Sequence, residues 1–457
     1  MATTLTSPPA PPAERWNTLE ILKAGRIALV VLDALLLIAA IAGARVHRYA
    51  MQTVGKDSAP SIIAAQHIKS ALADMDADAA NELLGAPGTM SDAVKAYESR
   101  RVEAAKALIA AAENITYGES ERTPIQSLQV GMGTYERLIQ RARDLHERGD
   151  AKFTAAYRDG AKLMDETLLP AADALDKANN EVLERTYEGQ SGNSTAARLF
   201  LGLVGLVLLG ALVTAQIFLT QRTRRTLNPL LAAATLLVAG TVQYTMSAMA
   251  TERHQLKVAK EDAFTSVHAL WRARAVSYWA NSDESRYLLD AEHAAEYERN
   301  FFTKFALLAK LPSNVSIAEV ASAERNATQV DGFSGYLADE LNNITFPGER
   351  EAAVDTLLRY EDYLGVDKQI RGFEHGGKHQ QAVDLCMGTQ VGQSDWAFER
   401  FDRALGATLD INQSAFDEAV GKGLSVLDWL EIKASVLAAA IAALMFLGLA
   451  ARIREYE

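Results

Sequence analysis

Five side chains within residues 271–279 are the best candidates for molecular recognition in this sequence. They are Trp271, Arg272, Arg274, Tyr278 and Trp279. Arginine binds carboxylates through a planar fork of N–H donors, and aromatic side chains supply large contact surfaces with a polar group at one edge. Together they predict a surface for an acidic ligand or for an acidic face of a partner protein.

The orientation of these residues depends on how their helix aligns with an earlier stretch of the chain. An offset of 204 residues places Arg272 at the position of Ile68, inside a packing seam, where an unpaired charge is costly. An offset of 205 residues instead aligns the Leu288-Leu289 pair with Leu83-Leu84, and the arginines then face water. The sequence leaves both alignments open.

The sequence lacks the patterns that would predict an enzyme. It has no Gly-rich phosphate loop followed by Lys, no HExxH and no GxSxG, so we expect neither catalysis nor a cofactor. Asp74, Asp76 and Asp78 alternate along one predicted helix, and we expect them to be solvated rather than to share a site. His375 and His379 flank two glycines, which predicts a turn between helices and no metal site.

Composition excludes two further classes of protein. The net charge of −12 disfavours binding to nucleic acid. Cys386 is the only cysteine, so neither an intramolecular disulfide nor a zinc site of several thiolates can form.

Four apolar runs predict membrane-spanning helices. Residues 199–219, 230–250 and 434–451 contain no Asp, Glu, Lys or Arg, and 27–44 contains only Asp33. At about 1.5 Å per residue, such runs cover a hydrocarbon core of roughly 30 Å. We therefore expect a multi-pass protein of the cell (plasma or inner) membrane, surrounded by the lipid bilayer, with spans at 24–44, 197–220, 229–250 and 434–451.

Polar and small residues within the spans carry two further expectations. Asp33 is the ionisable residue well inside a span, so it should face the other helices and meet Thr214, Gln216, Thr241 or Gln243, or else carry a proton. Small residues at four-residue spacing, such as Ala39 with Gly43, permit close helix contact and thus a homodimer.

Arginines predict the orientation in the membrane. Arg222, Arg224 and Arg225 lie in the connection 221–228, and short Arg-rich loops stay in the cytoplasm. Both termini are then cytoplasmic, with 1–23 a disordered Pro-rich tail and 452–457 a short tail, whereas 45–196 and 251–433 lie outside. Residues 42–44 also resemble a signal-peptidase site, so cleavage of the first span is an alternative.

The two external segments are copies of each other. Four anchors recur in the same order: VGKDSA at 54–59 with VAKEDA at 258–263, AYESR at 96–100 with EYERN at 296–300, NITYGE at 114–119 with NITFPGE at 343–349, and Tyr135-Glu136 with Tyr360-Glu361. An ordered set of matches, bracketed each time by apolar spans, indicates an internal duplication. The second copy carries an insertion near 311–342.

Each copy has the periodicity of a helical bundle. Apolar residues recur every three or four positions along 65–83 and again along 168–182, and two shorter helices are expected at 91–115 and 122–148. The predicted fold is all-α, an integral membrane protein with four transmembrane helices and two tandem antiparallel four-helix-bundle extracytoplasmic domains. Pro170 should kink the last helix of the first bundle.

This layout resembles the four-helix-bundle sensory modules of bacterial chemoreceptors and histidine kinases. The whole architecture also resembles the GlnX family of actinobacterial membrane proteins, through segments such as VGKDSAPSIIAAQ at 54–66 and LLPAADALD at 168–176. The second resemblance implies an extracytoplasmic solute-binding protein for amino acids as the input and a cytosolic Ser/Thr kinase as the output.

We therefore expect a transmembrane sensor or signal relay. The alternatives are a structural envelope scaffold and an accessory subunit of a transporter, neither of which requires the bundles to change conformation.

Overall fold

The computed structural model describes residues 18–88, 91–223 and 227–455, and these residues form helices without a β-strand. The helices are α1 (Thr18–Gln52), α2 (Ala59–Leu84), α3 (Ser91–Glu113), α4 (Glu119–Glu147), α5 (Phe153–Leu163), α6 (Leu169–Thr223), α7 (Pro229–Lys257), α8 (Thr265–Leu289), α9 (Ala294–Leu308), α10 (Ile317–Arg325), α11 (Tyr336–Asn342), α12 (Glu349–His375), α13 (His379–Cys386), α14 (Ser394–Leu427) and α15 (Leu430–Ile453). Three π-helical segments lie between them: η1 (Thr53–Ser58), η2 (Met164–Leu168) and η3 (Val258–Phe264). The all-α prediction is confirmed for this part of the chain.

The helices divide into two compact units. We call Ala50–Gly189 with His254–Gly423 the bundle unit, and Met1–Tyr49 with Gln190–Arg253 and Leu424–Glu457 the apolar unit. The apolar unit contains all four runs that predict membrane spans. Four continuous helical stretches are long and apolar enough to cross a membrane.

Leucine spacing explains the packing of the apolar unit. Leu22, Leu29 and Leu36 recur every seven residues along α1 and are almost fully buried, against apolar residues of α6, α7 and α15. Asn228 begins α7: its side-chain oxygen accepts the N–H of Leu230 at 3.1 Å, and its side-chain N–H₂ donates to the carbonyl of Gly448 at 2.8 Å.

Two expectations for the apolar unit need correction. Asp33 is buried, as expected, but none of its four predicted partners bonds to it. The hydroxyls of Thr214 and Thr241 donate to carbonyls of their own helices. The side-chain amide of Gln216 donates to the carbonyl of Asn228, and that of Gln243 donates to the hydroxyl of Ser247. Residues 18–23, expected in the disordered tail, belong to α1.

The arginine prediction is only partly covered by the structure. Arg224 and Arg225 lie outside the described residues, whereas Arg222 closes the last turn of α6.

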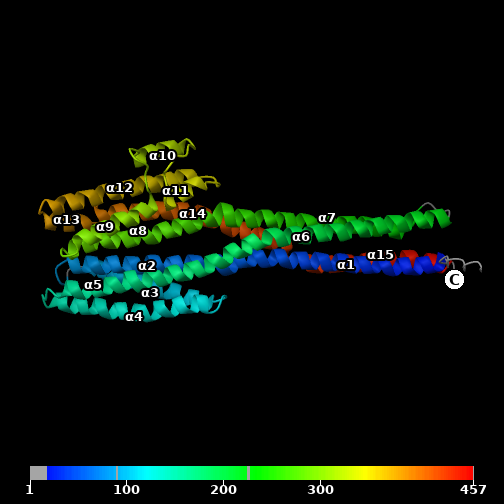
Figure 1. The fold of residues 1–457 in the computed structure, drawn as a ribbon, viewed down its shortest axis with the longest axis horizontal. Helices are drawn as coiled ribbons and strands as arrows, with labels where there is room; N and C mark the ends of the chain where they lie inside the picture. Colours follow the sequence, from blue (N-terminus) through cyan, green and yellow to red (C-terminus); the bar gives the residue numbers. More distant parts are fainter. Residues whose placement is uncertain (1–17, 89–90, 224–226, 456–457) are drawn as a thin grey trace, which may run out of the picture. The chain divides into compact units, whose positions relative to one another are not determined.

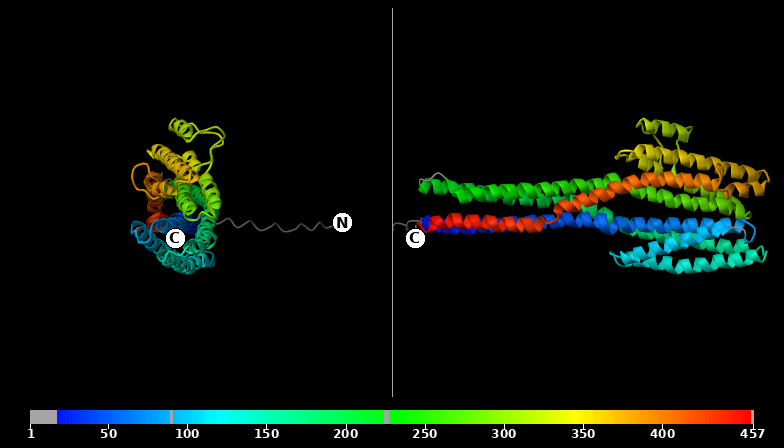
Figure 2. Two further views of the ribbon diagram at one scale, coloured as in Figure 1. Left: turned by 90° about the vertical axis from the view of Figure 1, so that its left-hand side faces the viewer. Right: turned by 180° about the vertical axis from the view of Figure 1, so that it is seen from behind.

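In the bundle unit, α2 of the first copy packs directly against α8 of the second copy (Figure 1). Helices α3, α4 and α5 lie on the first copy's side, and α9, α11, α12 and α13 lie on the second copy's side (Figures 1 and 2). The first helix of each copy is therefore buried between the two copies.

Corresponding side-chain bonds recur in the two segments that the sequence predicts to be copies. Asn114, the first residue of the first NIT anchor, donates its amide to the carbonyl of Asp57 at 3.2 Å and to the hydroxyl of Ser61 at 2.7 Å. Asn343 in the second anchor donates to the carbonyls of Glu261 and Asp262 and to the hydroxyl of Ser266. In both copies an asparagine thus bonds to the π-helical segment of the first helix, where the widened turn leaves carbonyls without helical partners.

A glutamate closes the turn after each of these anchors. Glu121 accepts the backbone N–H groups of Thr116 and Tyr117, and Glu349 accepts those of Thr345 and Phe346, at 2.6–2.8 Å. The glycine beside each turn, Gly118 or Gly348, has a positive φ of 72° or 83° that disfavours other residues.

The matched asparagine bonds also determine the alignment of the copies. They pair Ser61 with Ser266, an offset of 205 residues, and not the 204 that places Arg272 in a packing seam. Arg272 therefore corresponds to His67, and Ala273 to Ile68.

A π-helical segment lies directly before Pro170. The π-helical segment η2 ends two residues before Pro170, and α6 then runs from Leu169 to Thr223. Proline cannot donate to the preceding turn, and a wider turn accommodates its ring. Pro60 follows η1 in the same way.

The insertion in the second copy forms α10 and α11. Ser316 and Glu319 make a capping box that begins α10. Lys310 and Ser334 exchange backbone hydrogen bonds at 2.7 and 3.1 Å, which closes the base of the inserted segment.

Candidate functional site

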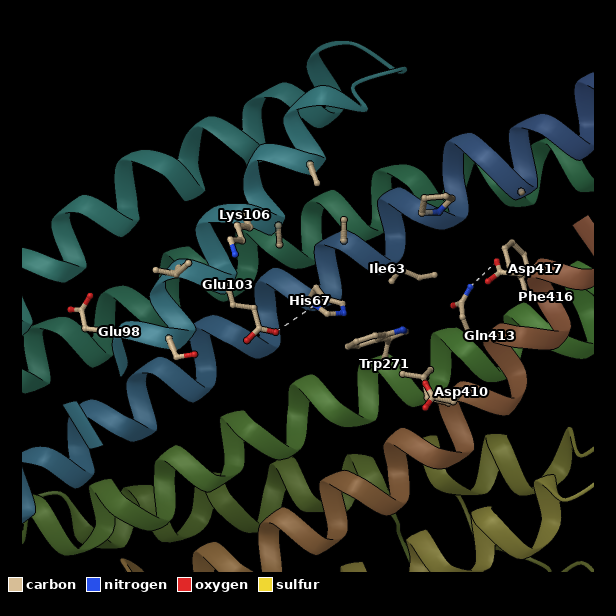
Figure 3. A pocket seen from close by; sticks show the side chains of 18 of the residues that line it. Ile63, His67, Glu98, Glu103, Lys106, Trp271, Asp410, Gln413, Phe416 and Asp417 are labelled. Carbon is tan, nitrogen blue, oxygen red and sulfur yellow. Dashed lines mark hydrogen bonds and ion pairs between the residues drawn. The ribbon is translucent and has the colours of Figure 1, made fainter. Parts of the chain in front are cut away.

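A groove of about 1070 Å³ runs between the two copies in the bundle unit (Figure 3). Helices α2 and α3 of the first copy form one side, and α8 and α14 of the second copy form the other. Each copy alone would form only half of this groove.

The floor of the groove is aromatic and apolar. His67 from α2 and Trp271 from α8 face each other with ring centroids 4.1 Å apart (Figure 3). Ile63 and Phe416 extend the same surface. Burial lowers the pKa of His67 despite the neighbouring Glu103, so its imidazole is neutral at physiological pH.

The walls of the groove carry more acidic than basic groups. The carboxylates are Glu98, Glu103, Asp410 and Asp417, and the lysines are Lys95 and Lys106. This balance disfavours the acidic ligand that the arginines of residues 271–279 predict.

Arg274 and Tyr278 line a small cavity that shares His67, Glu103 and Trp271 with the groove. Arg274 makes a bidentate pair with Asp402, at 2.7 and 2.6 Å, and its charge is thereby neutralised within the protein. The neighbouring Arg100 pairs with Asp74 at 2.5 Å. Three predicted recognition residues, Trp271, Arg274 and Tyr278, are therefore brought together with His67 around one small cavity.

The other two predicted residues lie elsewhere. Arg272 is exposed, and its guanidinium lies over the ring of Tyr336, 4.9 Å from the centroid. Trp279 lines a second groove of about 640 Å³, between η2 and α9, and its indole N–H donates to Asp165 at 2.8 Å. The five residues thus do not form a single surface.

A cluster of buried charged groups around Arg286 was not predicted from the sequence. Arg286 on α8 is fully buried and donates to Asp76 of the first copy at 2.6 and 3.0 Å. It also donates to Asp165 at 2.8 Å and to Asp283 at 3.0 Å. Lys304 bonds to the other oxygen of Asp283 at 2.5 Å.

Two tyrosines complete this cluster around Asp76. The hydroxyl of Tyr135 donates to one carboxylate oxygen at 2.8 Å, and that of Tyr157 donates to the other at 3.0 Å. A charge-assisted network of this kind holds the two copies together in one arrangement. No signal in the sequence indicated this cluster, because Asp76 lies outside the apolar seam of its helix and spacing along the chain does not identify a cation on another helix.

The expectation that Asp74, Asp76 and Asp78 are solvated is therefore wrong. Asp76 is completely buried, and the other two are only partly exposed. Burial and the neighbouring Asp74 raise the pKa of Asp78 to about 9, and burial and Asp74 raise the pKa of Asp395 to about 7. Alternation along α2 did not direct these groups to water because α2 packs on several sides.

One group of side chains among the described residues has the spacing of a metal site. Asp290, Glu292 and His293 have candidate ligand atoms within 4.8 Å of one another. Arg158, however, already bonds to Asp290 at 2.7 and 2.9 Å and to Glu292 at 2.9 Å. The guanidinium thus already occupies oxygens of both carboxylates.

The residue pair predicted to flank a turn does so. His375 ends α12, Gly377 has a φ of 70°, and His379 begins α13, where its ring bonds to Glu374 at 2.9 Å.

Comparison with known proteins supplies a broad functional class. Residues 50–188 match the family model of an actinobacterial sensor domain. The match covers the first copy within the bundle unit, and it supports a sensing or signalling role and an actinobacterial source. No curated protein and no solved structure matches the chain.

Proposed function

We propose that the protein is a GlnX-like transmembrane sensor or signal relay, with both termini in the cytoplasm and two tandem extracytoplasmic bundles. The bundles receive a solute, either directly or on a solute-binding protein that delivers amino acids. The change passes to a cytosolic effector such as a Ser/Thr kinase. The sensor-domain match to residues 50–188 supports the sensing part of this proposal.

Surface composition supports the membrane part. Large apolar side chains of the apolar unit are exposed, including Leu199, Leu206 and Leu236, each with about 70% of its surface accessible. Many exposed leucines on the same helices are unfavourable in water and favourable in a lipid bilayer.

The observation that carries the proposal is the groove between the copies. A solute that binds there contacts α2 and α8 together, and these helices are continuous along the chain with η1 and α1 and with η3 and α7. Ligands shift packed helices by about 1–2 Å in known switching proteins. Binding across the groove would thus change the relation between the first helices of the two copies.

Direct binding can be tested by thermal-shift measurements on the full chain in detergent. The screen would use amino acids, dicarboxylates and organic amines, with wild-type protein and the variant Trp271→Ala. Trp396→Ala is the matched control, because Trp396 lies on α14, stacks with Arg400 and does not line the groove. We expect a stabilising solute whose effect is lost in Trp271→Ala and kept in Trp396→Ala.

Delivery by a binding protein requires a second experiment. Mild cross-linking in native membranes should capture an extracytoplasmic solute-binding protein and a cytosolic kinase, the former less well with Trp271→Ala. If no solute stabilises the protein and only envelope structural components are captured, the relay is wrong and a scaffold role is favoured.

A further inference from the structure

Two buried glutamates of the second copy face each other without a cation. Glu340 on α11 is 1% exposed, and Glu349 at the start of α12 is fully buried. One oxygen of each is occupied: Glu340 Oε1 accepts from Asn412 at 3.2 Å, and Glu349 Oε2 accepts the N–H groups of Thr345 and Phe346. Neither Glu340 Oε2 nor Glu349 Oε1 receives a hydrogen bond from the described residues.

The surroundings of the pair explain why both groups cannot ionise together. Neutral groups face it from the packed helices: Ser266 on α8 and Asn412 on α14. Asp339, the neighbour of Glu340 on α11, is exposed and interacts with Arg272 instead.

The resulting shift is large. Burial, the charge of Glu349 and a hydrogen bond with Glu349 together raise the pKa of Glu340 to about 8, although bonds with Ser266 and Asn412 partly oppose the rise. A proton on Glu340 Oε2 can donate to Glu349 Oε1, which satisfies both free oxygens at once.

The first copy provides a natural comparison. Glu121 closes its turn as Glu349 does, accepting two backbone N–H groups. Three residues before the anchor asparagine, however, the first copy has Ala111, where the second has Glu340. The second carboxylate is therefore a feature of the second copy.

We propose that Glu340 and Glu349 form a proton-binding site that makes the packing of α11 on α12 and α14 depend on extracytoplasmic pH. The ligand is a single proton shared between the two carboxyl groups. Its loss leaves two negative charges in a buried site without a cation, which favours local opening of the second copy around its NIT anchor. The inference does not rest on solute binding in the groove.

The sign of the effect follows from proton linkage. The folded protein holds the proton up to about pH 8, whereas an open or unfolded Glu loses it near its ordinary value of 4.5. The opened state therefore binds fewer protons in this window, and local stability falls as pH rises from about 4.5 to about 8. The opening equilibrium constant should increase about tenfold per pH unit and level off above about pH 8.

Hydrogen–deuterium exchange with mass spectrometry on the full chain in detergent tests this proposal. The reporter is segment 336–353, and segment 108–125 of the same molecule is the internal control. Exchange is compared between wild type and Glu340→Gln at each pH, so that the chemical dependence of exchange on pH cancels. The titration of Glu284, another buried glutamate of the second copy with a pKa near 8, contributes equally to both proteins.

We expect protection of 336–353 in the wild type to fall by at least tenfold between about pH 6 and about pH 8, relative to Glu340→Gln. The variant keeps a donor toward Glu349 at every pH, and its protection should stay level. Glu340→Ala, which reproduces the Ala111 of the first copy, should also lose the pH dependence even if it is less protected throughout. Equal pH profiles in the wild type and in both variants, or the same loss in 108–125, would overturn the proposal.

Discussion

Replacement of Arg286 by Met should destabilise the bundle unit more than any other single change on the surface between the two copies. Arg286 is fully buried and bonds to three carboxylates, of Asp76, Asp165 and Asp283. Methionine has a similar length and retains the packing, so the experiment removes mainly the charge and its donors.

The magnitude follows from what remains in the cluster. In the wild type two cations, Arg286 and Lys304, face three carboxylates. Without Arg286, Lys304 still neutralises Asp283, but Asp76 keeps only the hydroxyls of Tyr135 and Tyr157. Leaving one buried charge uncompensated costs about 3–5 kcal/mol.

Other groups reduce the cost only in part. Burial acts to raise the pKa of Asp165, but Arg286, Lys304 and a bond from Trp279 outweigh it and lower that pKa. In Arg286→Met, the partly exposed Asp165 can hydrate or take up a proton. Asp76, which is completely buried, cannot hydrate.

Urea titration of the full chain in detergent, followed by far-ultraviolet circular dichroism, measures this loss. Arg272→Met is the matched control on the same helix, because Arg272 is exposed and its ring contact with Tyr336 contributes only about 0.5–1 kcal/mol. Adding Asp76→Leu to Arg286→Met should recover part of the stability, since the buried charge is removed with its partner. A loss below about 1 kcal/mol for Arg286→Met, equal to that of Arg272→Met, would refute the argument.

Two further predictions concern the repeat anchors and the close contact of helices. Asn343→Ala removes three hydrogen bonds to the π-helical segment and to Ser266 and should cost about 1–3 kcal/mol in a urea titration, whereas a loss below about 0.5 kcal/mol would mean that the anchor is dispensable. Gly55→Ala should cost about 1–3 kcal/mol, because the new Cβ would lie 2.5 Å from Cγ1 of Val420. The control Gly133→Ala has no atom within 4 Å of its Cβ and should stabilise α4 by about 0.5–1 kcal/mol; a lower urea midpoint for Gly133→Ala than for Gly55→Ala would contradict this reasoning.

One pair of equivalent positions carries unlike side chains that contact each other. His47 and Glu252 lie 205 residues apart, the offset that also relates Ser61 to Ser266, and they form a fully buried pair within the apolar unit. Equivalent positions therefore carry unlike, complementary side chains. Duplication within one chain permits such asymmetry, because each copy can then adapt separately to the other, whereas identical subunits must place the same residue at both positions.

Part of the candidate site could be read from the sequence. Trp271, Arg274 and Tyr278 were identified by residue type and do gather around one cavity. Their ligand chemistry was not predictable, since Asp402 and the acidic walls come from helices far away along the chain. The position of Arg272 stayed open in the sequence because a shift of one residue turns a helical side chain by about 100°, and the asparagine bonds of the folded chain decide the register.

The sequence by itself determined the helices, the duplication and the four apolar runs. Heptad spacing, the repeated sequence anchors and the uncharged stretches are local patterns. The helices that they predict do not depend on which other helix packs against them. Only the tertiary structure decided which surfaces the two copies share. Asp76 on α2 and Arg286 on α8 are 210 residues apart, and their contact depends on the packing of two helices whose faces are apolar on several sides. Burial, which turns ordinary carboxylates into groups that hold a proton near neutral pH, arises from that packing alone.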